Sequence, residues 1–260
     1  MPRLSLLLPL LFVSALTTAY ATPEAKAAEY VELEARAPAQ VISRCTVPNT
    51  VALTFDDGPY LYTRGIVDQL EAVGGKATFF VNGNNWGCIY DSDKAGNIKY
   101  AYDRGHQIAS HTWAHRHLNS LTWDQIHDEM WRVELALSRI TGGVPAFMRP
   151  PYGEYNNLVR EAAGIRNQSL VLWDFDSGDS TGSSVSSQKT KYTNLANSRP
   201  STILSLQHEV YQSTVNEVLP HAISQLRAKG YTFVTVADCL GTRKYQRTGP
   251  AQARDSNWHC

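Results

Sequence analysis

Short runs of apolar and β-branched residues recur along the chain. They are nearly continuous in apolar residues, as strands that are buried on both faces of a sheet should be. Segments with the apolar period of helices lie between them, and this alternation is typical of a parallel α/β architecture. The pattern predicts one catalytic domain, a distorted (β/α) barrel of about seven parallel strands. The runs cover residues 51–57, 76–83, 106–112, 146–153, 169–176, 201–209 and 231–239.

In three stretches the apolar residues recur with the period of an α-helix, and each stretch ends in a glycine, which commonly terminates helices. Residues 64–75 and 121–143 both end in glycines, and the second also begins with a Thr or Asp that can act as a cap. Residues 214–230 follow the same scheme, but Pro220 predicts either a kink or a late start of that helix. The polar segment 177–190 is expected to be a long loop at the end of a strand.

The N-terminus has the features of a secretory signal peptide over residues 1–21. Arg3 precedes an apolar run over residues 4–16, and Ala19 and Ala21 stand where a signal peptidase prefers small residues. The alternative is a membrane anchor, but the apolar run is shorter than the ~20 residues that a spanning helix needs. We therefore expect a secreted, extracellular protein, in solution or at the cell wall, without a membrane span.

The remaining chain divides into three parts by composition. Residues 22–44 are rich in Ala and Glu, show no strand pattern, and are expected to form a linker or pro-segment. Residues 45–241 contain all the predicted strands and form the barrel domain. Residues 242–260 are a polar C-terminal tail.

Charge and composition narrow the class of partner. The chain has no net formal charge, and 18% of its residues are charged. This balance gives no electrostatic reason to expect binding to nucleic acid or to an anionic membrane surface. The low charge content with 13 Tyr and 6 Trp residues fits a secreted protein that handles a neutral polymer, and we expect a monomer.

Four cysteines fit an oxidising compartment, where an even number predicts disulfides, and they allow three pairings. Cys45 precedes the first strand and Cys239 ends the last, so their disulfide would link the two ends of the domain. The second disulfide would then join Cys88 to Cys260 by elimination. The Asn-Gln-Ser triplet at Asn167 is the single N-glycosylation acceptor in the sequence, and it predicts a glycoprotein.

Chemically active residues stand at the ends of the predicted strands. In a (β/α) barrel the carboxyl ends of the strands meet on one face, which is where catalytic residues gather. These side chains are therefore expected to converge on one site. They are Asp56 and Asp57 after the first run, His111 after the third, Arg149 in the fourth, Asp174 and Asp176 in the fifth, and His208 in the sixth.

His111 and His115 are spaced so that both imidazoles can reach one metal ion. With one aspartate of the Asp56-Asp57 pair they make a three-ligand site that leaves a position open for water. Zinc in such a site lowers the pKa of bound water to about 7, and the second aspartate can then accept a proton from it. Neighbouring strand residues point in opposite directions, so a turn directly after the pair must bring both carboxylates to the site. The ligand types favour Zn²⁺ and also allow Co²⁺ or Ni²⁺.

Five motifs together resemble those of the polysaccharide deacetylases, carbohydrate esterase family four. The resemblance covers about residues 46–241, and the first motif in its context is most similar to the fungal chitin deacetylases. The first two motifs carry most of its specificity. The motifs, in chain order, are TFDDGP, SHTWAH, RPPYG, WDFDSGD and LSLQH.

The resemblance implies a role for each matching residue of the first three motifs. Asp56 corresponds to the family's catalytic base, and Asp57 to its metal-binding aspartate. Both histidines of the second motif bind metal in the family, which implies His111 and His115. The family's arginine holds the catalytic base, so Arg149 is expected to pair with Asp56.

The later motifs imply the remaining roles. Tyr152 would donate its backbone N–H to the oxyanion, and Leu206 would line the pocket for the acetyl methyl group. His208 corresponds to the general acid, and Asp176 matches best the aspartate that orients it.

Two positions depart from the family pattern. Asp179 is followed by Ser180 where the family usually has tryptophan, which makes Trp173 the candidate for covering that side of the pocket. The last motif continues with Glu209 in place of the common aspartate.

The resemblance implies an enzyme, a chitin deacetylase that hydrolyses the N-acetyl groups of N-acetylglucosamine units in chitin or its oligomers, giving chitosan and acetate. The alternatives keep the chemistry and change the substrate to acetylxylan or peptidoglycan, or replace catalysis with chitin binding alone. A binding protein would be expected to lack the base or the acid, and here Asp56 and His208 are both present.

Overall fold

The fold consists of a mostly parallel sheet with helices around it. The computed structural model describes residues 37–260, so the predicted signal peptide lies outside the described residues. The strands are β1 (Val41–Ile42), β2 (Thr50–Ala52), β3 (Thr54–Gly58), β4 (Thr78–Val81), β5 (Gln107–Ser110), β6 (Gly143–Pro145), β7 (Phe147–Met148), β8 (Ser169–Val171), β9 (Phe175–Asp176), β10 (Thr202–His208), β11 (Thr232–Phe233) and β12 (Tyr245–Thr248).

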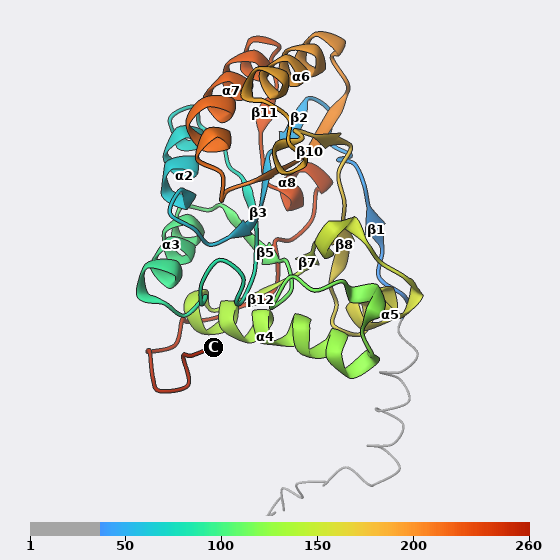
Figure 1. Ribbon diagram of the computed structural model, residues 1–260, viewed down its shortest axis with the longest axis vertical. Coiled ribbons are helices and arrows are strands. Elements are labelled where there is room, and N and C mark those ends of the chain that lie inside the picture. The colour runs from blue at the N-terminus through green and yellow to red at the C-terminus, as the bar shows by residue number, and fades with distance from the viewer. Residues whose placement is uncertain (1–36) are drawn as a thin grey trace, which may run out of the picture. The chain divides into compact units, whose positions relative to one another are not determined.

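The helices lie on the outside of this sheet (Figure 1). Their ends follow the sequence signals where these are strong. Thr122 caps α4 through a capping box with Gln125, and Gly142 ends the helix in the left-handed conformation that favours glycine. The helices are α2 (Thr63–Glu71), α3 (Ser92–Asp103), α4 (Trp123–Thr141), α5 (Asn157–Ile165), α6 (Val185–Ser198), α7 (Leu219–Ala228) and α8 (Val236–Leu240).

The main sheet has ten strands in the order β1-β8-β7-β5-β4-β3-β10-β2-β11, with β9 also beside β10. All of its strand pairs are parallel. Residues 169–176 pair with β7 at their start, as β8, and with β10 at their end, as β9. One segment thus contributes a strand to each of two parts of the sheet. Each of the seven predicted runs contains at least one strand, so the α/β prediction is confirmed.

The core has an inner and an outer part because the strands are buried on both faces. Phe79 and Phe80 are neighbours in β4, so their side chains point to opposite faces, and both are fully buried. Phe79 packs in the outer cluster with residues of α2 such as Ile66 and Leu70. Phe80 packs in the inner cluster with residues of other strands such as Leu204. Burying a side chain of this size contributes roughly 1.5–3 kcal/mol.

The structure corrects three expectations about the organisation of the chain. The predicted linker, residues 22–44, overlaps the folded domain, because β1 pairs with β8 and Ala39 is buried. The predicted loop, residues 177–190, ends in the first turns of α6. The predicted tail contains β12, which pairs with β6 in a separate antiparallel ladder. These segments are short or polar, so their apolar pattern is weak.

The helix around Pro220 does not start late, because the backbone is helical from residue 212 onward. Residues Thr214–Val218 form one π-helical segment, and α7 continues directly after it with Pro220 in its first turn. A π-helical segment displaces the backbone hydrogen bonds by one residue, which lets the helix accommodate a proline that has no N–H.

The two disulfides are the predicted ones, Cys45–Cys239 and Cys88–Cys260. The first pair is buried beside β2 and β10, and the second holds the C-terminus, where residues 251–257 are all exposed. Among the described residues, none of the helices combines the length and apolar character that crossing a membrane requires.

We expect the two disulfides to contribute unequally to stability. The chain-entropy model assigns each of these long loops about 5 kcal/mol. However, the exposed C-terminus can open locally without unfolding the sheet, which reduces the contribution of Cys88–Cys260. Replacing Cys45 and Cys239 with alanine should therefore lower the urea midpoint more than replacing Cys88 and Cys260. Equal midpoints for the two double variants would contradict this ranking.

Candidate functional site

Asp56 and Asp57 face the same site because β3 contains a bulge. The register between β3 and β4 shifts between Asp56 and Gly58, and Asp57 has a φ of 72°. A bulge re-aims one side chain of a strand, which lets two consecutive carboxylates turn to the same side. The prediction assigned this effect to the turn after the pair. The turn is present, with a cis bond between Gly58 and Pro59, but it follows the bulge.

Asp57, His111 and His115 form a compact group, which we call the Asp-His-His cluster. Their ligand atoms all lie within 4.8 Å of one another. The Asp57 Oδ1 atom is 3.4 Å from His115 Nε2 and 3.7 Å from His111 Nε2. Tetrahedral zinc with ligands at about 2.0–2.1 Å places its ligand atoms roughly 3.3–3.5 Å apart. The three side chains therefore fit a zinc-sized cation with little movement.

The hydrogen bonding of His111 supports its use as a ligand. Its Nδ1 atom lies 2.8 Å from the backbone oxygen of Arg149, and a carbonyl can only accept, so Nδ1 carries the proton. The lone pair of Nε2 then points into the cluster, as in metal sites whose ligand histidines are held by a second partner. Burial lowers the pKa of His111 to about 3, which keeps the ring neutral and able to bind a cation.

The loop that carries the histidines has a strained backbone held by buried partners. Thr112 and His115 both have positive φ values, 69° and 53°. Such conformations persist only where the surroundings enforce them. The Ala114 N–H donates to the buried carboxylate of Glu129 on α4 at 2.8 Å. This contact holds the loop in the conformation that turns both rings toward Asp57.

Two asparagines after β4 connect the cluster to its neighbours. The side chain of Asn82 donates to the backbone oxygens of His111 and Thr112. Asn85 donates to Asn82 Oδ1 at 3.1 Å and to Asp57 Oδ1 at 3.4 Å. Sequence analysis did not identify either residue, although Asn82 lies near the end of the predicted run 76–83 and Asn85 follows it.

Arg149 pairs with Asp56, as the resemblance implied. Its Nη1 donates to Asp56 Oδ1 at 2.8 Å and to Thr54, and its other nitrogens donate to the backbone oxygens of Val171 and Leu172. The guanidinium is fully buried, so these partners replace the water that it gives up. Burial raises the pKa of Asp56, and the charge of Arg149 opposes that increase.

The structure corrects the assignment of the aspartate that orients His208. Asp179, rather than Asp176, lies 2.8 Å from His208 Nδ1 and also accepts the backbone N–H of His208 at 2.7 Å. Thr214 donates a further hydrogen bond to Asp179 at 2.9 Å. Asp176 instead accepts the N–H of Gly178 and reaches only the rim of the site. The reason is the turn at Gly178, which carries Asp179 back toward β10.

Asp179 also sets the charge of His208. Burial alone lowers the pKa of this imidazole. The hydrogen bond and charge of Asp179, together with the charges of Asp56 and Asp57, outweigh burial and raise the pKa to about 9. His208 is therefore protonated at neutral pH, with Nδ1 bound to Asp179 and Nε2 available to donate.

The buried side chain of Glu209 packs against the turn at Gly58 and Pro59, which follows the two aspartates. Its carboxylate accepts a hydrogen bond from Thr63, and a Cβ atom at Gly58 would lie only 1.2 Å from it. Burial raises the pKa of Glu209 to about 8. The position before Pro59 thus requires glycine because the glutamate fills the space that a side chain would need.

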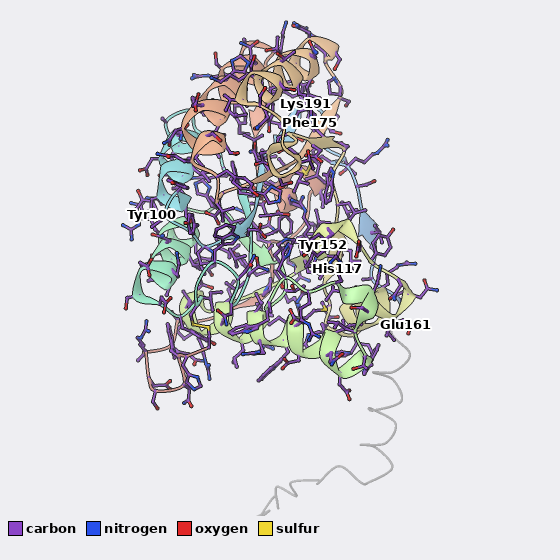
Figure 2. The ribbon with its side chains drawn as sticks, viewed as in Figure 1. Tyr100, His117, Tyr152, Glu161, Phe175 and Lys191 are labelled. Carbon is purple, nitrogen blue, oxygen red and sulfur yellow. A yellow bond between two sulfur atoms is a disulfide. The ribbon has the colours of Figure 1, made fainter. Side chains whose placement is uncertain are left out.

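Nine of the ten predicted site residues line one pocket of about 440 Å³, and Arg149 lies directly behind it. Tyr152 forms an exposed wall of the pocket, with its ring 4.7 Å from that of His115 and stacked on His117 at 4.0 Å (Figure 2). Trp173 packs against Gly153, where a Cβ atom would lie 2.9 Å from the indole. Tyr211, which sequence analysis missed, completes the wall beside His208. The nine predicted residues are Asp56, Asp57, His111, His115, Tyr152, Trp173, Asp176, Leu206 and His208.

At the carboxyl end of the parallel sheet, one pocket holds three possible cation ligands, the paired carboxylate of Asp56 and the paired imidazole of His208, an arrangement that suits a hydrolytic α/β enzyme. Residues 43–167 match the polysaccharide deacetylase family. The chain is 42% identical over 207 residues to a chitin deacetylase of Pestalotiopsis sp, covering 77% of this chain and 67% of that protein. It is 36% identical over 203 residues to a peptidoglycan-N-acetylglucosamine deacetylase of Bacillus cereus, covering 76% and 70%.

A solved structure shows the same architecture. The chitin deacetylase from the fungal pathogen Colletotrichum lindemuthianum superposes with a TM-score of 0.75 at 33% identity, over 80% of this chain and 94% of that chain. The curated chitin deacetylase of that organism is 36% identical over 205 residues, covering 77% of this chain and 83% of the relative. The chain belongs to the polysaccharide deacetylase family.

Proposed function

We propose that this protein is a secreted, metal-dependent chitin deacetylase that hydrolyses the N-acetyl groups of N-acetylglucosamine units in chitin or its oligomers. The observation that carries the proposal is that one pocket brings together the Asp-His-His cluster, Asp56 with its partner Arg149, and His208 with its partner Asp179. Amide hydrolysis needs a base for water, a charge that stabilises the oxyanion, and an acid for the leaving amine. The three groups supply these in one pocket.

The cluster would hold the cation, with zinc favoured by its ligand types and spacing. Such a cation supplies Lewis acidity to a water molecule and to the amide carbonyl. Asp56 would accept the proton of the attacking water, and Arg149 would hold the carboxylate in position. Burial raises the pKa of Asp56, which makes this carboxylate a stronger base than one in solution.

Tyr152 and His208 would supply the two remaining requirements of the reaction, a donor to the oxyanion and a proton for the leaving amine. The Tyr152 backbone N–H would donate to the oxyanion, a contribution of roughly 3–4 kcal/mol for one such donor. His208 would donate the proton that the leaving nitrogen requires, since an amine leaves poorly without it. Leu206 and Trp173 would line the space for the acetyl methyl group.

Three features support an extended sugar polymer as the substrate. Tyr152 is 54% exposed at the pocket wall, and Trp86 is 47% exposed next to Asn85, which contacts Asp57. Exposed aromatic rings pack well on the apolar faces of pyranoses. The relatives named above act, by their names, on polymers that contain N-acetylglucosamine. The disulfides and the N-terminal segment support secretion, and we expect a monomer.

Acetate release provides the direct test. We expect the purified protein to release acetate from chitin oligomers, to lose this activity after treatment with a chelator, and to regain it when zinc or cobalt is added. Acetylxylan and peptidoglycan should be poorer substrates by kcat/KM. Full activity after complete metal removal would refute the metal-dependent reaction, and a preference for peptidoglycan would move the assignment to the second group of relatives.

A further inference from the structure

A cavity away from the active site lies at the amino ends of β1, β7 and β8. We call it the amino-end cavity, and it has a volume of about 630 Å³, within the roughly 300–1,000 Å³ of small-molecule sites. Parallel strands place their amino and carboxyl ends on opposite sides, so the amino-end cavity does not communicate with the pocket around the Asp-His-His cluster.

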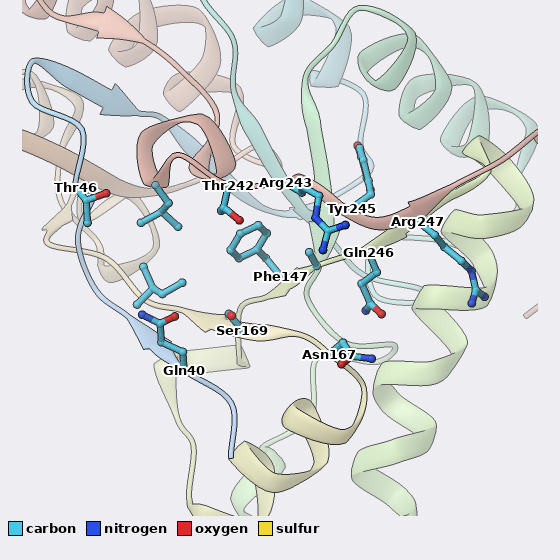
Figure 3. Close-up of a pocket in the computed structure, with 13 residues that line it drawn as sticks. Gln40, Thr46, Phe147, Asn167, Ser169, Thr242, Arg243, Tyr245, Gln246 and Arg247 are labelled. Atoms are coloured by element: carbon cyan, nitrogen blue, oxygen red, sulfur yellow. The ribbon is translucent and has the colours of Figure 1, made fainter. Parts of the chain in front are cut away.

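The walls of the amino-end cavity combine polar groups with one aromatic ring (Figure 3). Gln40, Ser169 and Arg243 provide polar groups, and Phe147 provides the aromatic ring. Sugars present hydroxyl groups at their edges and apolar C–H groups on their faces, so such a combination matches them.

Asn167 stands at the rim of this cavity and begins the acceptor triplet Asn167-Gln168-Ser169. It is exposed and occupies the turn after α5 with a φ of 52°, a conformation that asparagine tolerates well. The turn is held rigidly, because the guanidinium of Arg166 donates two hydrogen bonds of 2.6 Å to Glu134 on α4. Gln246 in β12 donates to the backbone oxygen of Arg166 and fixes the turn against the far wall.

We propose that Asn167 carries an N-linked glycan whose first N-acetylglucosamine lies in the amino-end cavity. The inference rests on the proposed entry into the secretory pathway, but not on the proposed reaction. The transfer forms a bond between the side-chain nitrogen of Asn167 and the anomeric carbon of a lipid-pyrophosphate-linked oligosaccharide. The bond from that carbon to the pyrophosphate breaks, the lipid pyrophosphate leaves, and the amide loses one proton.

The transfer must precede folding of this edge of the sheet. Gln168 is buried, and the N–H of Ser169 donates to the backbone oxygen of Ala146. The triplet is therefore not extended and free in the folded domain. Once the domain folds, the attached sugar lies beside the cavity and can remove its polar walls from water.

Secretion of the full chain from a eukaryotic host tests the attachment, with the host's own leader substituted if the native segment does not direct export. Intact mass and peptide mapping before and after enzymatic glycan release should show one glycan, located at Asn167. Asn167→Asp should lack it, whereas Asn197→Asp, an exposed asparagine outside any acceptor triplet, should retain it. A secreted protein whose Asn167 is unmodified would overturn the proposal.

Hydrogen exchange tests the position of the sugar. Glycosylated protein, and protein trimmed enzymatically to a single N-acetylglucosamine, should exchange the amides of residues 242–248 more slowly than Asn167→Asp. The glycan should also raise Tm by about 2–4 °C. Equal exchange in all three forms would show that the sugar projects into solvent. Acetate release by Asn167→Asp should equal that of the glycosylated protein, so failure here is separable from failure of the proposed reaction.

Discussion

Replacing His111 with alanine should abolish stoichiometric zinc binding and lower kcat/KM for acetate release by at least about 10³-fold. The size of the effect follows from the several kcal/mol that a catalytic cation contributes to transition-state stabilisation. His111 is the buried member of the Asp-His-His cluster, and Arg149 holds its ring so that Nε2 faces Asp57. Alanine leaves two ligands, which are too few to hold zinc in a site of this kind.

His117 offers a matched control for this experiment. It lies two residues beyond His115, but its Nδ1 atom is 2.9 Å from Glu154, its ring stacks on Tyr152, and it is not part of the cluster. His117→Ala should keep one zinc per protein and change kcat less than about tenfold. Zinc content measured by mass spectrometry, together with steady-state kinetics and Tm for both variants, provides the comparison. Full zinc occupancy in a folded, active His111→Ala protein would contradict the assigned site.

Replacing Asp179 with asparagine should lower kcat by about 10²–10⁴-fold, the typical contribution of a positioned general acid. An asparagine side chain can present its NH₂ group to His208 Nδ1, which must then accept, so it favours the neutral ring over the imidazolium that a general acid requires. It also removes the negative charge that faces the ring. Asp176→Asn changes a residue of the same pocket that does not contact His208, and it should cost much less.

The pH profile separates a positioning role of Asp179 from a purely structural one. The general acid must be protonated to act, so activity falls as the pH rises through the pKa of His208. Asp179 is the main group that raises this pKa to about 9. Asp179→Asn should therefore move the alkaline limb of kcat to lower pH, whereas Asp176→Asn should leave it in place. An unchanged limb in the Asp179 variant would contradict the assignment.

Spacing along the chain was not sufficient to identify the aspartate that orients His208. Asp176 and Asp179 both belong to the fourth motif, and the sequence analysis chose Asp176 as the partner. The choice depends on the pairing of β9 with β10, which places Asp176 beside Leu206, and on the turn at Gly178 that follows. Neither feature has a strong local signal.

The short strand and the polar helix also could not be predicted from the local sequence pattern. Strand β1 has two residues, too few for any apolar pattern, and it forms because β8 offers an edge with which it can pair. Helix α6 is polar on most of its surface and follows a glycine- and serine-rich segment, so its composition resembled a loop. Packing against α7 gives it the partner that its sequence alone does not reveal.

The sequence by itself determined the alternation of strands and helices, and it identified the candidate cation ligands and the candidate acid and base, because each depends on an apolar run or on a motif at a strand end. Tertiary structure alone decided that the bulge at Asp57 turns two neighbouring carboxylates to one side, that Asp179 reaches His208, and that a second cavity opens beside Asn167. These features arise from contacts between segments far apart in the chain, and the free energy of such contacts is not encoded in any local pattern.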